Sequence, residues 1–175
     1  MIRNLPARWD YEANIVSIGS GIGGLSAAIT AHDNGATAIV LERSEEVGGV
    51  TALSLGELWI AGNHLALASG IEDSPESGFR YLERLSMEYG EDLAILNNVV
   101  HARVALEYFE DRINLETRVI RKCPDYYYGV TEDSVAEGRL LEVLPFPAKS
   151  LGEWQSRTRV SRCCLPMPVR PHSMP

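Results

Sequence analysis

Gly19, Gly21 and Gly24 form a G-x-G-x-x-G pattern near the start of the chain. The apolar run at residues 14–18 before it predicts a strand, and the small, apolar residues at 25–32 after it predict a helix. At such a junction the first glycine permits a tight turn, the second lets backbone approach a ligand, and the third lets the helix pack closely on the strand. Free N–H groups at the start of the helix favour an anionic ligand. The pattern therefore predicts a turn that binds the diphosphate of a dinucleotide.

An acidic residue, Glu42, follows a second apolar run at residues 36–41. The run is rich in β-branched residues and does not alternate with polar ones, so we expect a strand buried on both faces of a parallel sheet. Gly35 before it is the predicted end of the helix. An acid at the tip of this strand accepts hydrogen bonds from ribose hydroxyls and repels a 2′-phosphate, which disfavours NADP.

A second glycine pair, Gly48-Gly49, comes soon after Glu42 and is followed by Thr51 and Ser54. Glycines at this place let backbone pass close to another part of the same ligand, and the two hydroxyls can donate hydrogen bonds to it. An NAD-binding domain normally continues into a helix at this point. The segment therefore favours FAD over NAD, with a flexible surface turn as the alternative.

The run GSGIGGLSAAITAHDNGATAIVLERSEEVGG, followed by TALS and LWIAGN, resembles the FAD-binding domain of fumarate reductase, succinate dehydrogenase and 3-ketosteroid dehydrogenase flavoproteins. The resemblance is strongest over residues 14–63. A weaker similarity to the ketosteroid-dehydrogenase-like branch continues through PDYYYG and AEGRLLEVLPF to about residue 160. The resemblance implies three groups of cofactor-binding residues: at the diphosphate Gly19, Ser20, Gly21, Gly23 and Gly24; at the adenosine Glu42 and Arg43; and toward the ribityl chain and flavin Gly48, Gly49, Thr51, Ser54 and Gly56.

The resemblance also bears on how the cofactor is held. Some members of the family attach FAD covalently through a histidine soon after the second strand, whereas this chain has no histidine between His32 and His64. The resemblance therefore implies non-covalent FAD, and we interpret His64 as structural or solvent-facing. Leu55 and Glu57 stand where family members often have glycines next to the flavin.

Two helices and a short strand are predicted after the glycine-rich region. The sequence SPE at residues 74–76 is a typical helix start, and helical spacing follows at Phe79, Leu82 and Leu85. Beyond Gly90 a second helix is expected to bury one broad apolar face, formed by Leu93, Leu96, Val100, Val104 and Phe109. The run at residues 117–120 is typical of a strand.

The predicted fold class is α/β: a Rossmann-like parallel-sheet FAD-binding domain, incomplete, with a mainly helical continuation. Residues 1–70 are assigned to the N-terminal part of that domain, with a βαβ unit and an irregular, glycine-rich loop. Residues 71–160 form the helical continuation. The proline-rich residues 161–175 form an irregular tail.

Composition excludes several classes of function. The net charge of -8 argues against nucleic acid and anionic membrane surfaces as partners. The three cysteines, Cys123, Cys163 and Cys164, fit neither a disulfide framework nor a metal site, and they are expected to be reduced thiols. The sequence contains no secretory signal and no apolar run long enough to span a membrane, so a cytoplasmic location is expected.

The sequence predicts a FAD-dependent oxidoreductase of the fumarate reductase/3-ketosteroid dehydrogenase type, acting at a C–C bond next to a carbonyl or carboxylate. The expected substrate is a small molecule, steroid-like or dicarboxylate-like. No catalytic residue or oligomeric state is assigned, and residues 126–128, three tyrosines, are expected to supply one buried anchor with exposed neighbours. Family members are longer, and the composition changes after about residue 160. The alternative is therefore a truncated, catalytically silent nucleotide-binding or interaction fragment.

Overall fold

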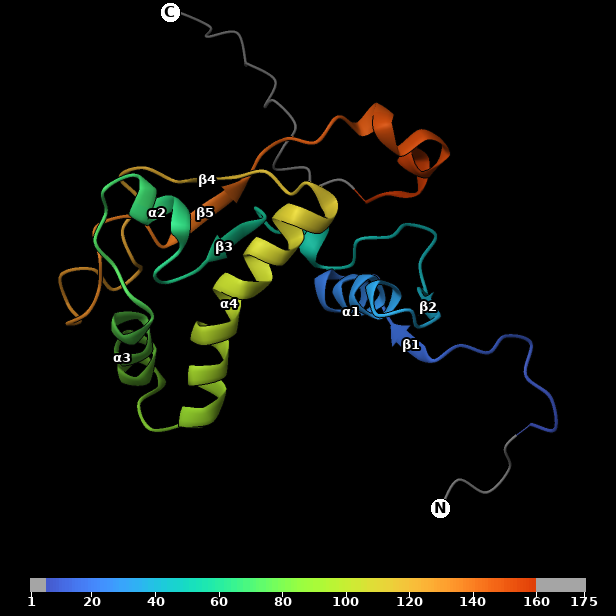
Figure 1. Cartoon of the computed structure of the whole chain (residues 1–175), viewed down its shortest axis with the longest axis horizontal. Helices are drawn as coiled ribbons and strands as arrows, with labels where there is room; N and C mark the ends of the chain where they lie inside the picture. The colour runs from blue at the N-terminus through green and yellow to red at the C-terminus, as the bar shows by residue number, and fades with distance from the viewer. Residues whose placement is uncertain (1–5, 160–175) are drawn as a thin grey trace, which may run out of the picture. The chain divides into compact units, whose positions relative to one another are not determined.

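A computed structural model of the chain describes residues 6–159. They form two compact units, each described by itself. The first unit contains residues 6–55 and 147–159, and the second unit is Gly56–Phe146. Figure 1 labels their helices and strands. The predicted irregular tail at residues 161–175, with Cys163 and Cys164, lies outside the described residues.

The first unit contains the predicted strand–helix–strand arrangement. Strand β1 (Ile15–Ile18) leads into helix α1 (Ile22–Asp33), and strand β2 (Ala38–Leu41) follows. The two strands pair in parallel from Ile15↔Ala38 to Ile18↔Leu41. Gly35, with φ +75°, follows the end of the helix, as predicted. The βαβ prediction is therefore confirmed.

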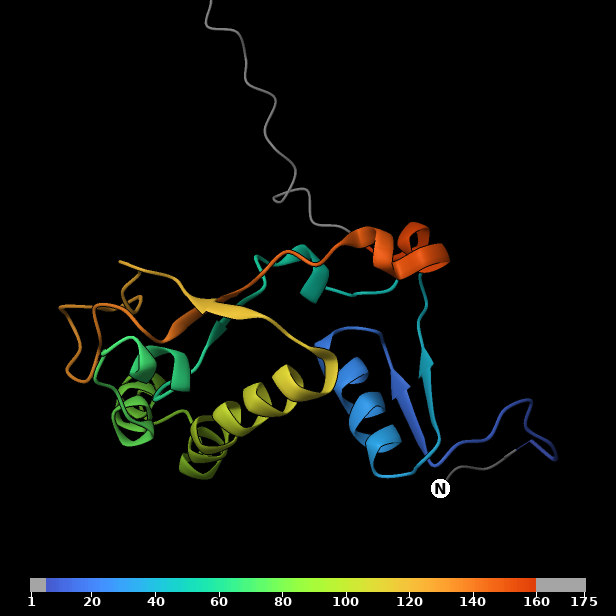
Figure 2. The same cartoon turned by 45° about the horizontal axis from the view of Figure 1, so that its top comes forward.

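The burial predicted for the second strand is wrong within the described residues. Leu41 is 52% exposed, and on β1 Val16 is 53% and Ile18 90% exposed. The physical reason is that the parallel sheet has two strands among residues 6–159, and α1 packs beside them (Figure 2). A strand of a parallel sheet is buried on both faces only where helices cover both of them.

Residues 147–159 belong to the first unit, although the whole second unit, Gly56–Phe146, precedes them in the chain. They form the 3₁₀ helical segment η2 (Ala148–Arg157), and Thr158 then makes a parallel bridge to Val47. The Val47 N–H donates to the Arg157 carbonyl at 2.7 Å, and the Arg159 N–H donates to the Val47 carbonyl at 2.9 Å. The end of the predicted continuation is thus attached to the second glycine loop.

The second unit is built on a three-stranded antiparallel sheet. Its order is β3 (Glu57–Trp59), β5 (Leu140–Val143), β4 (Thr117–Val119). The predicted short strand is confirmed as β4. The boundary predicted at residue 70 falls inside this unit, because β3 and the short helix α2 (His64–Ala68) belong to it.

Two longer helices complete the second unit. Helix α3 (Pro75–Ser86) has Ser74 as N-cap, whose hydroxyl accepts from the Ser77 N–H at 3.2 Å, so its predicted start is confirmed. Helix α4 (Asp92–Ile113) follows and packs against α3. The hydrophobic core of the unit gathers apolar residues from the strands, α4 and their connections: Ile60, Leu106 and Leu141, with Leu58, Leu65, Ala102, Leu115 and Val119 packed against them.

The face that α4 buries differs from the predicted one. Four of the five residues expected to be buried are exposed by 46–66%: Leu93, Leu96, Val100 and Val104. The fifth, Phe109, is half-buried. Val99 and Leu106, seven positions apart, are each 3% exposed and supply the buried face instead. The helix carries apolar residues on two faces, and tertiary packing buries only one of them.

A buried arginine ties the strands, helix α3 and a long loop of the second unit together. The Arg139 side chain is fully buried and ion-paired with Asp73 at 2.7 Å and Asp125 at 2.9 Å. The rings of Trp59 and Tyr81 each lie 5.4 Å from its guanidinium carbon. Arginine is suited to such a site because its planar group forms several hydrogen bonds and stacks on aromatic rings.

The three tyrosines at residues 126–128 supply no buried anchor, in contrast to the prediction. They are 84%, 54% and 52% exposed, respectively. The preceding residue, Asp125, is 3% exposed and fixes this loop instead. Its carboxylate accepts hydrogen bonds from the Trp59 indole at 2.8 Å and from the Val135 N–H at 3.0 Å. A hydrogen-bonded carboxylate thus holds the loop where an aromatic ring was expected.

Candidate functional site

The first glycine turn joins β1 to α1 by a very close approach of backbone. Gly19 has φ +96°, and its N–H donates to the Leu41 carbonyl at 2.7 Å. A Cβ added to Gly24 would lie 1.9 Å from the Gly19 carbonyl oxygen, which leaves no room for any side chain. The first and third glycines of the pattern are therefore required by the turn itself.

Among the described residues, several N–H groups at the start of α1 have no protein acceptor. The Ile22 N–H donates to Thr51 Oγ1 at 3.0 Å, and the Leu25 N–H donates to the Gly21 carbonyl. Within residues 6–159, the N–H groups of Gly21, Gly23 and Gly24 have no recorded acceptor, and no side chain caps the helix. Unpaired amides at a helix N-terminus form a site for an anion such as a diphosphate.

Glu42 lies against this turn, at the end of β2. Its Oε2 accepts hydrogen bonds from the N–H of Ser20 at 3.0 Å and from the Ser20 hydroxyl at 2.6 Å. Its Oε1 accepts from the N–H of Ser44 at 3.0 Å. These donors, the Ser20 hydroxyl first, lower the pKa of Glu42 from 4.5 to about 2. The carboxylate is therefore ionised at neutral pH and held in place before any ligand arrives.

Ser20 connects the two glycine loops. The residue is 1% exposed, and its hydroxyl donates to Glu42 while accepting from the Gly48 N–H at 2.9 Å. Both donors of Ser20 are used within the protein. A hydrogen bond from Ser20 to a diphosphate, as the resemblance implies, would require one of these bonds to be exchanged.

The second glycine loop packs directly on the first. Gly49 has φ +54°, and a Cβ there would lie 3.1 Å from the Gly21 Cα. Thr51 and Ser54, predicted as donors to the ligand, have internal partners here: Thr51 Oγ1 accepts from Ile22, and the Ser54 hydroxyl donates to the Thr51 carbonyl at 2.7 Å. The two predicted binding loops are thus adjacent in space, and their hydroxyls form hydrogen bonds with backbone groups of the protein.

The remaining predicted residues lie at different places. Arg43 is exposed just beyond Glu42. Gly56 has φ +74° and is the first residue of the second unit. His64, interpreted as structural or solvent-facing, has its Nε2 3.1 Å from Glu110 Oε2. Sequence reasoning missed the contact of Arg159 with the second glycine loop, because this contact joins positions 110 apart. Only covariation among homologues carries that kind of signal.

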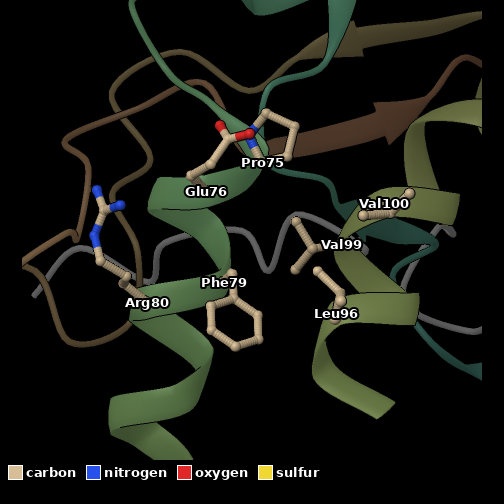
Figure 3. Close-up of a pocket in the computed structure, with 7 residues that line it drawn as sticks. All are labelled: Pro75, Glu76, Phe79, Arg80, Leu96, Val99 and Val100. Atoms are coloured by element: carbon tan, nitrogen blue, oxygen red, sulfur yellow. The ribbon is translucent and has the colours of Figure 1, made fainter. Parts of the chain in front are cut away.

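A cavity in the second unit is a less suitable site for chemistry. It lies between α3 and α4, with a volume of about 180 Å³, and is lined by Pro75, Glu76, Phe79, Arg80, Leu96, Val99 and Val100. In Figure 3 the Phe79 ring lies between the helices, whereas the Arg80 side chain extends away from α4. Arg80 is paired with Asp133 at 2.7 Å. The lining is mostly apolar and contains no group arranged for proton or group transfer.

We predict that Ser20→Ala raises the pKa of Glu42 from about 2 toward 4.5, because the Ser20 hydroxyl is the main cause of the lowered value. Because the folded-state pKa is the lower one, this carboxylate stabilises the fold above about pH 4.5 and loses that contribution as the pH falls toward 2. Carboxyl ¹³C NMR titration of Glu42 measures the change. Ser26→Ala, on α1, is the control and should leave this pKa unchanged. A pKa that stays near 2 in Ser20→Ala contradicts the assignment.

The geometry defines a class of protein: a βαβ dinucleotide-binding unit with an acid at the tip of its second strand. Comparison with known families identifies it further. The family described as "FAD binding domain" matches residues 14–174, and the chain belongs to this family. The predicted resemblance, α/β fold class and FAD as cofactor are confirmed.

Individual relatives share most of this chain. It is 33% identical to a 3-oxosteroid 1-dehydrogenase of Comamonas testosteroni over 142 residues, which cover 81% of the chain and 24% of the relative. It is 32% identical to a 4-oxocyclohexanecarboxylate 2-dehydrogenase of Sinomonas cyclohexanicum over 147 residues, which cover 83% of the chain and 25% of the relative. The chain thus spans about a quarter of the length of these curated relatives.

A solved structure of a dehydrogenase is also similar to this chain. The crystal structure of 3-ketosteroid delta1-dehydrogenase from Sterolibacterium denitrificans, in complex with 1,4-androstadiene-3,17-dione, is similar with a TM-score of 0.80 and 29% identity. The similarity covers 85% of this chain and 26% of that one. Within residues 6–159, no helix is both long and apolar enough to cross a membrane, and no cluster of side chains suits a metal ion.

Proposed function

We propose that this chain binds FAD non-covalently and forms the cofactor-binding part of a FAD-dependent oxidoreductase. One observation carries the proposal: N–H groups at the start of α1 that have no acceptor among residues 6–159 lie at the same turn as the ionised, pre-positioned carboxylate of Glu42. A helix N-terminus favours a diphosphate, and an acid at the neighbouring strand tip favours ribose hydroxyls over a 2′-phosphate.

The residues present fit the ADP portion of FAD. The N–H groups of Gly21, Gly23 and Gly24 would hold the diphosphate. The Glu42 carboxylate has about four acceptor positions, of which three are used, so one remains for a ribose hydroxyl. Gly49 places no side chain against the Gly21 amide, since a Cβ there would lie 3.2 Å from the Gly21 nitrogen. When bound, FAD supplies the hydride-transfer chemistry that amino acid side chains lack.

The substrate class follows from the named relatives. One acts on a 3-oxosteroid and another on 4-oxocyclohexanecarboxylate, and both names describe a ketone within a ring. We propose a small cyclic ketone, steroid-like or carboxylate-bearing, as the substrate of the whole protein. The reaction would remove or add two hydrogens across the C–C bond next to the carbonyl.

Flavin binding is the direct test. The purified chain, mixed with FAD and freed of excess, is expected to show absorbance near about 450 nm, and acid precipitation should release all of the flavin into the supernatant. Glu42→Arg should abolish binding, because it replaces the ribose acceptor with a cation. The matched control, Glu45→Arg, makes the same charge change at an exposed position and should bind FAD normally. Flavin retained in the pellet contradicts non-covalent attachment, and a colourless wild type contradicts the proposal.

The alternative, a catalytically silent nucleotide-binding fragment, makes a different prediction. Such a fragment would bind FAD without supporting turnover. Anaerobic addition of a 3-oxosteroid or of 4-oxocyclohexanecarboxylate to the FAD-loaded chain distinguishes the two cases. Bleaching of the flavin absorbance supports the oxidoreductase, whereas bound flavin that neither compound reduces supports the silent fragment.

A further inference from the structure

The second glycine loop, Ser44–Gly49, is held from two sides. From the first glycine turn, the Ser20 hydroxyl accepts from the Gly48 N–H at 2.9 Å. From the other side, residues 157–159 pair with Val47 through two backbone hydrogen bonds of 2.7 and 2.9 Å. The loop that packs on Gly21 is therefore fixed by a segment more than a hundred positions away.

Arg159 adds its side chain to this attachment. Its guanidinium donates to the Gly49 carbonyl at 3.5 Å and to the Ser44 hydroxyl at 3.3 Å, and its Nε lies 3.5 Å from Glu46 Oε2. One side chain thus contacts both ends of the loop and one of its two acidic residues, Glu46. Each contact is long, but together they constrain the loop at three points.

The neighbouring arginine provides a contrast. The Arg157 backbone contributes its carbonyl to the same pairing with Val47, yet its guanidinium lies over the Trp154 ring at 5.2 Å from the centroid. The two side chains therefore have different tasks: Arg157 packs within its own segment, and Arg159 reaches the glycine loop.

We propose that Arg159 is a positioning residue for the cofactor: its guanidinium holds Ser44–Gly49 in the conformation that packs on the first glycine turn, and so strengthens FAD binding. This inference rests on the proposed function for its effect on FAD. Its effect on the loop stands alone, because the contacts exist in the chain without a ligand.

The test uses the full chain with Arg159→Ala, Arg159→Lys and the matched control Arg157→Ala, which removes the same charge two positions away. Two measurements are made: hydrogen–deuterium exchange of residues 44–54 without ligand, and the FAD dissociation constant by titration. Arg159→Ala is expected to exchange faster in this segment and to bind FAD about tenfold more weakly. Arg159→Lys should recover part of both effects, and Arg157→Ala should stay within about twofold of wild type.

The outcomes separate this inference from the proposed function. If wild type binds no FAD, the proposed function fails, and the exchange data alone decide whether Arg159 holds the loop. If Arg159→Ala exchanges like wild type in residues 44–54, the positioning role is overturned. The role is also overturned if wild type and Arg159→Ala bind FAD equally well, or if Arg157→Ala produces the same losses.

Discussion

Gly24→Ala is expected to destabilise the βαβ unit by about 3 kcal/mol or more and to abolish FAD binding. The added Cβ would lie 1.9 Å from the carbonyl oxygen of Gly19, which is backbone and cannot rotate away. Helix α1 must then move off β1, and the N–H groups at its start lose their position. Hydrogen–deuterium exchange of residues 15–33 measures the local destabilisation, and titration with FAD measures the loss of binding.

Gly23→Ala is the matched control, because it adds the same methyl group one position earlier. A Cβ at Gly23 meets no atom within 4 Å. The fold of the chain without ligand should be unchanged or more stable by about 0.4–1 kcal/mol, since alanine restricts the unfolded chain. Equal destabilisation by the two substitutions would show that the close approach of Gly24 to Gly19 is not what requires glycine.

Arg139→Ala is expected to destabilise the second unit by about 3–5 kcal/mol, because it leaves two buried carboxylates without their cationic partner. The side chains of Asp73 and Asp125 are 0% and 1% exposed, so water does not replace the lost guanidinium. The substitution also removes the cation that lies 5.4 Å from the centres of both the Trp59 and the Tyr81 ring. Urea unfolding followed by near-ultraviolet circular dichroism, which reports the packing of these rings, measures the effect.

Arg118→Ala is the control for this prediction. Arg118 pairs with Glu142 at 2.6 Å on the same sheet, but the two side chains are 64% and 39% exposed. Exposed ion pairs contribute little, so the loss should stay below about 1 kcal/mol. If Arg139→Ala and Arg118→Ala shift the unfolding midpoint equally, burial is not what makes the Arg139 cluster important.

The parts of the fold that the sequence predicted well are local ones. The βαβ unit follows from glycine spacing and from apolar runs within about thirty residues, and each signal concerns neighbours in the chain. The start of α3 was predictable for the same reason, since Ser74 caps a helix that begins with Pro75. Local chemistry determined these elements, and the structure retains them.

Predictions failed where distant segments determine burial. Helix α4 has apolar residues on two faces, and the sequence alone does not say that Val99 and Leu106 face the core while Leu93 and Val100 stay exposed. The Asp125 loop was missed for a related reason, because its partners Trp59, on β3, and Arg139, just before β5, lie 66 and 14 positions away in the chain. Tertiary packing makes these choices, and hydrophobic periodicity does not encode them.

In the candidate site, too, local features were predictable from the sequence and contacts between distant segments were not. The glycines and Glu42 were identifiable from spacing, but the inward-facing hydroxyls of Ser20 and Thr51 were expected to face the ligand. Whether a hydroxyl bonds a ligand or a backbone amide depends on the loop packed against it, here Ser44–Gly49. The attachment of that loop by Arg159 required the three-dimensional structure.

The long separation between Gly49 and Arg159, 110 positions, has a consequence for biosynthesis. A ribosome makes the chain from the N-terminus, so both glycine turns leave the exit tunnel well before the residues that pin the second one. A nascent chain stalled before residue 159 would contain the start of α1 and Glu42, but its second glycine loop would lack the contacts from Arg159. Tight capture of flavin during translation would therefore begin late, after the whole second unit has been synthesised.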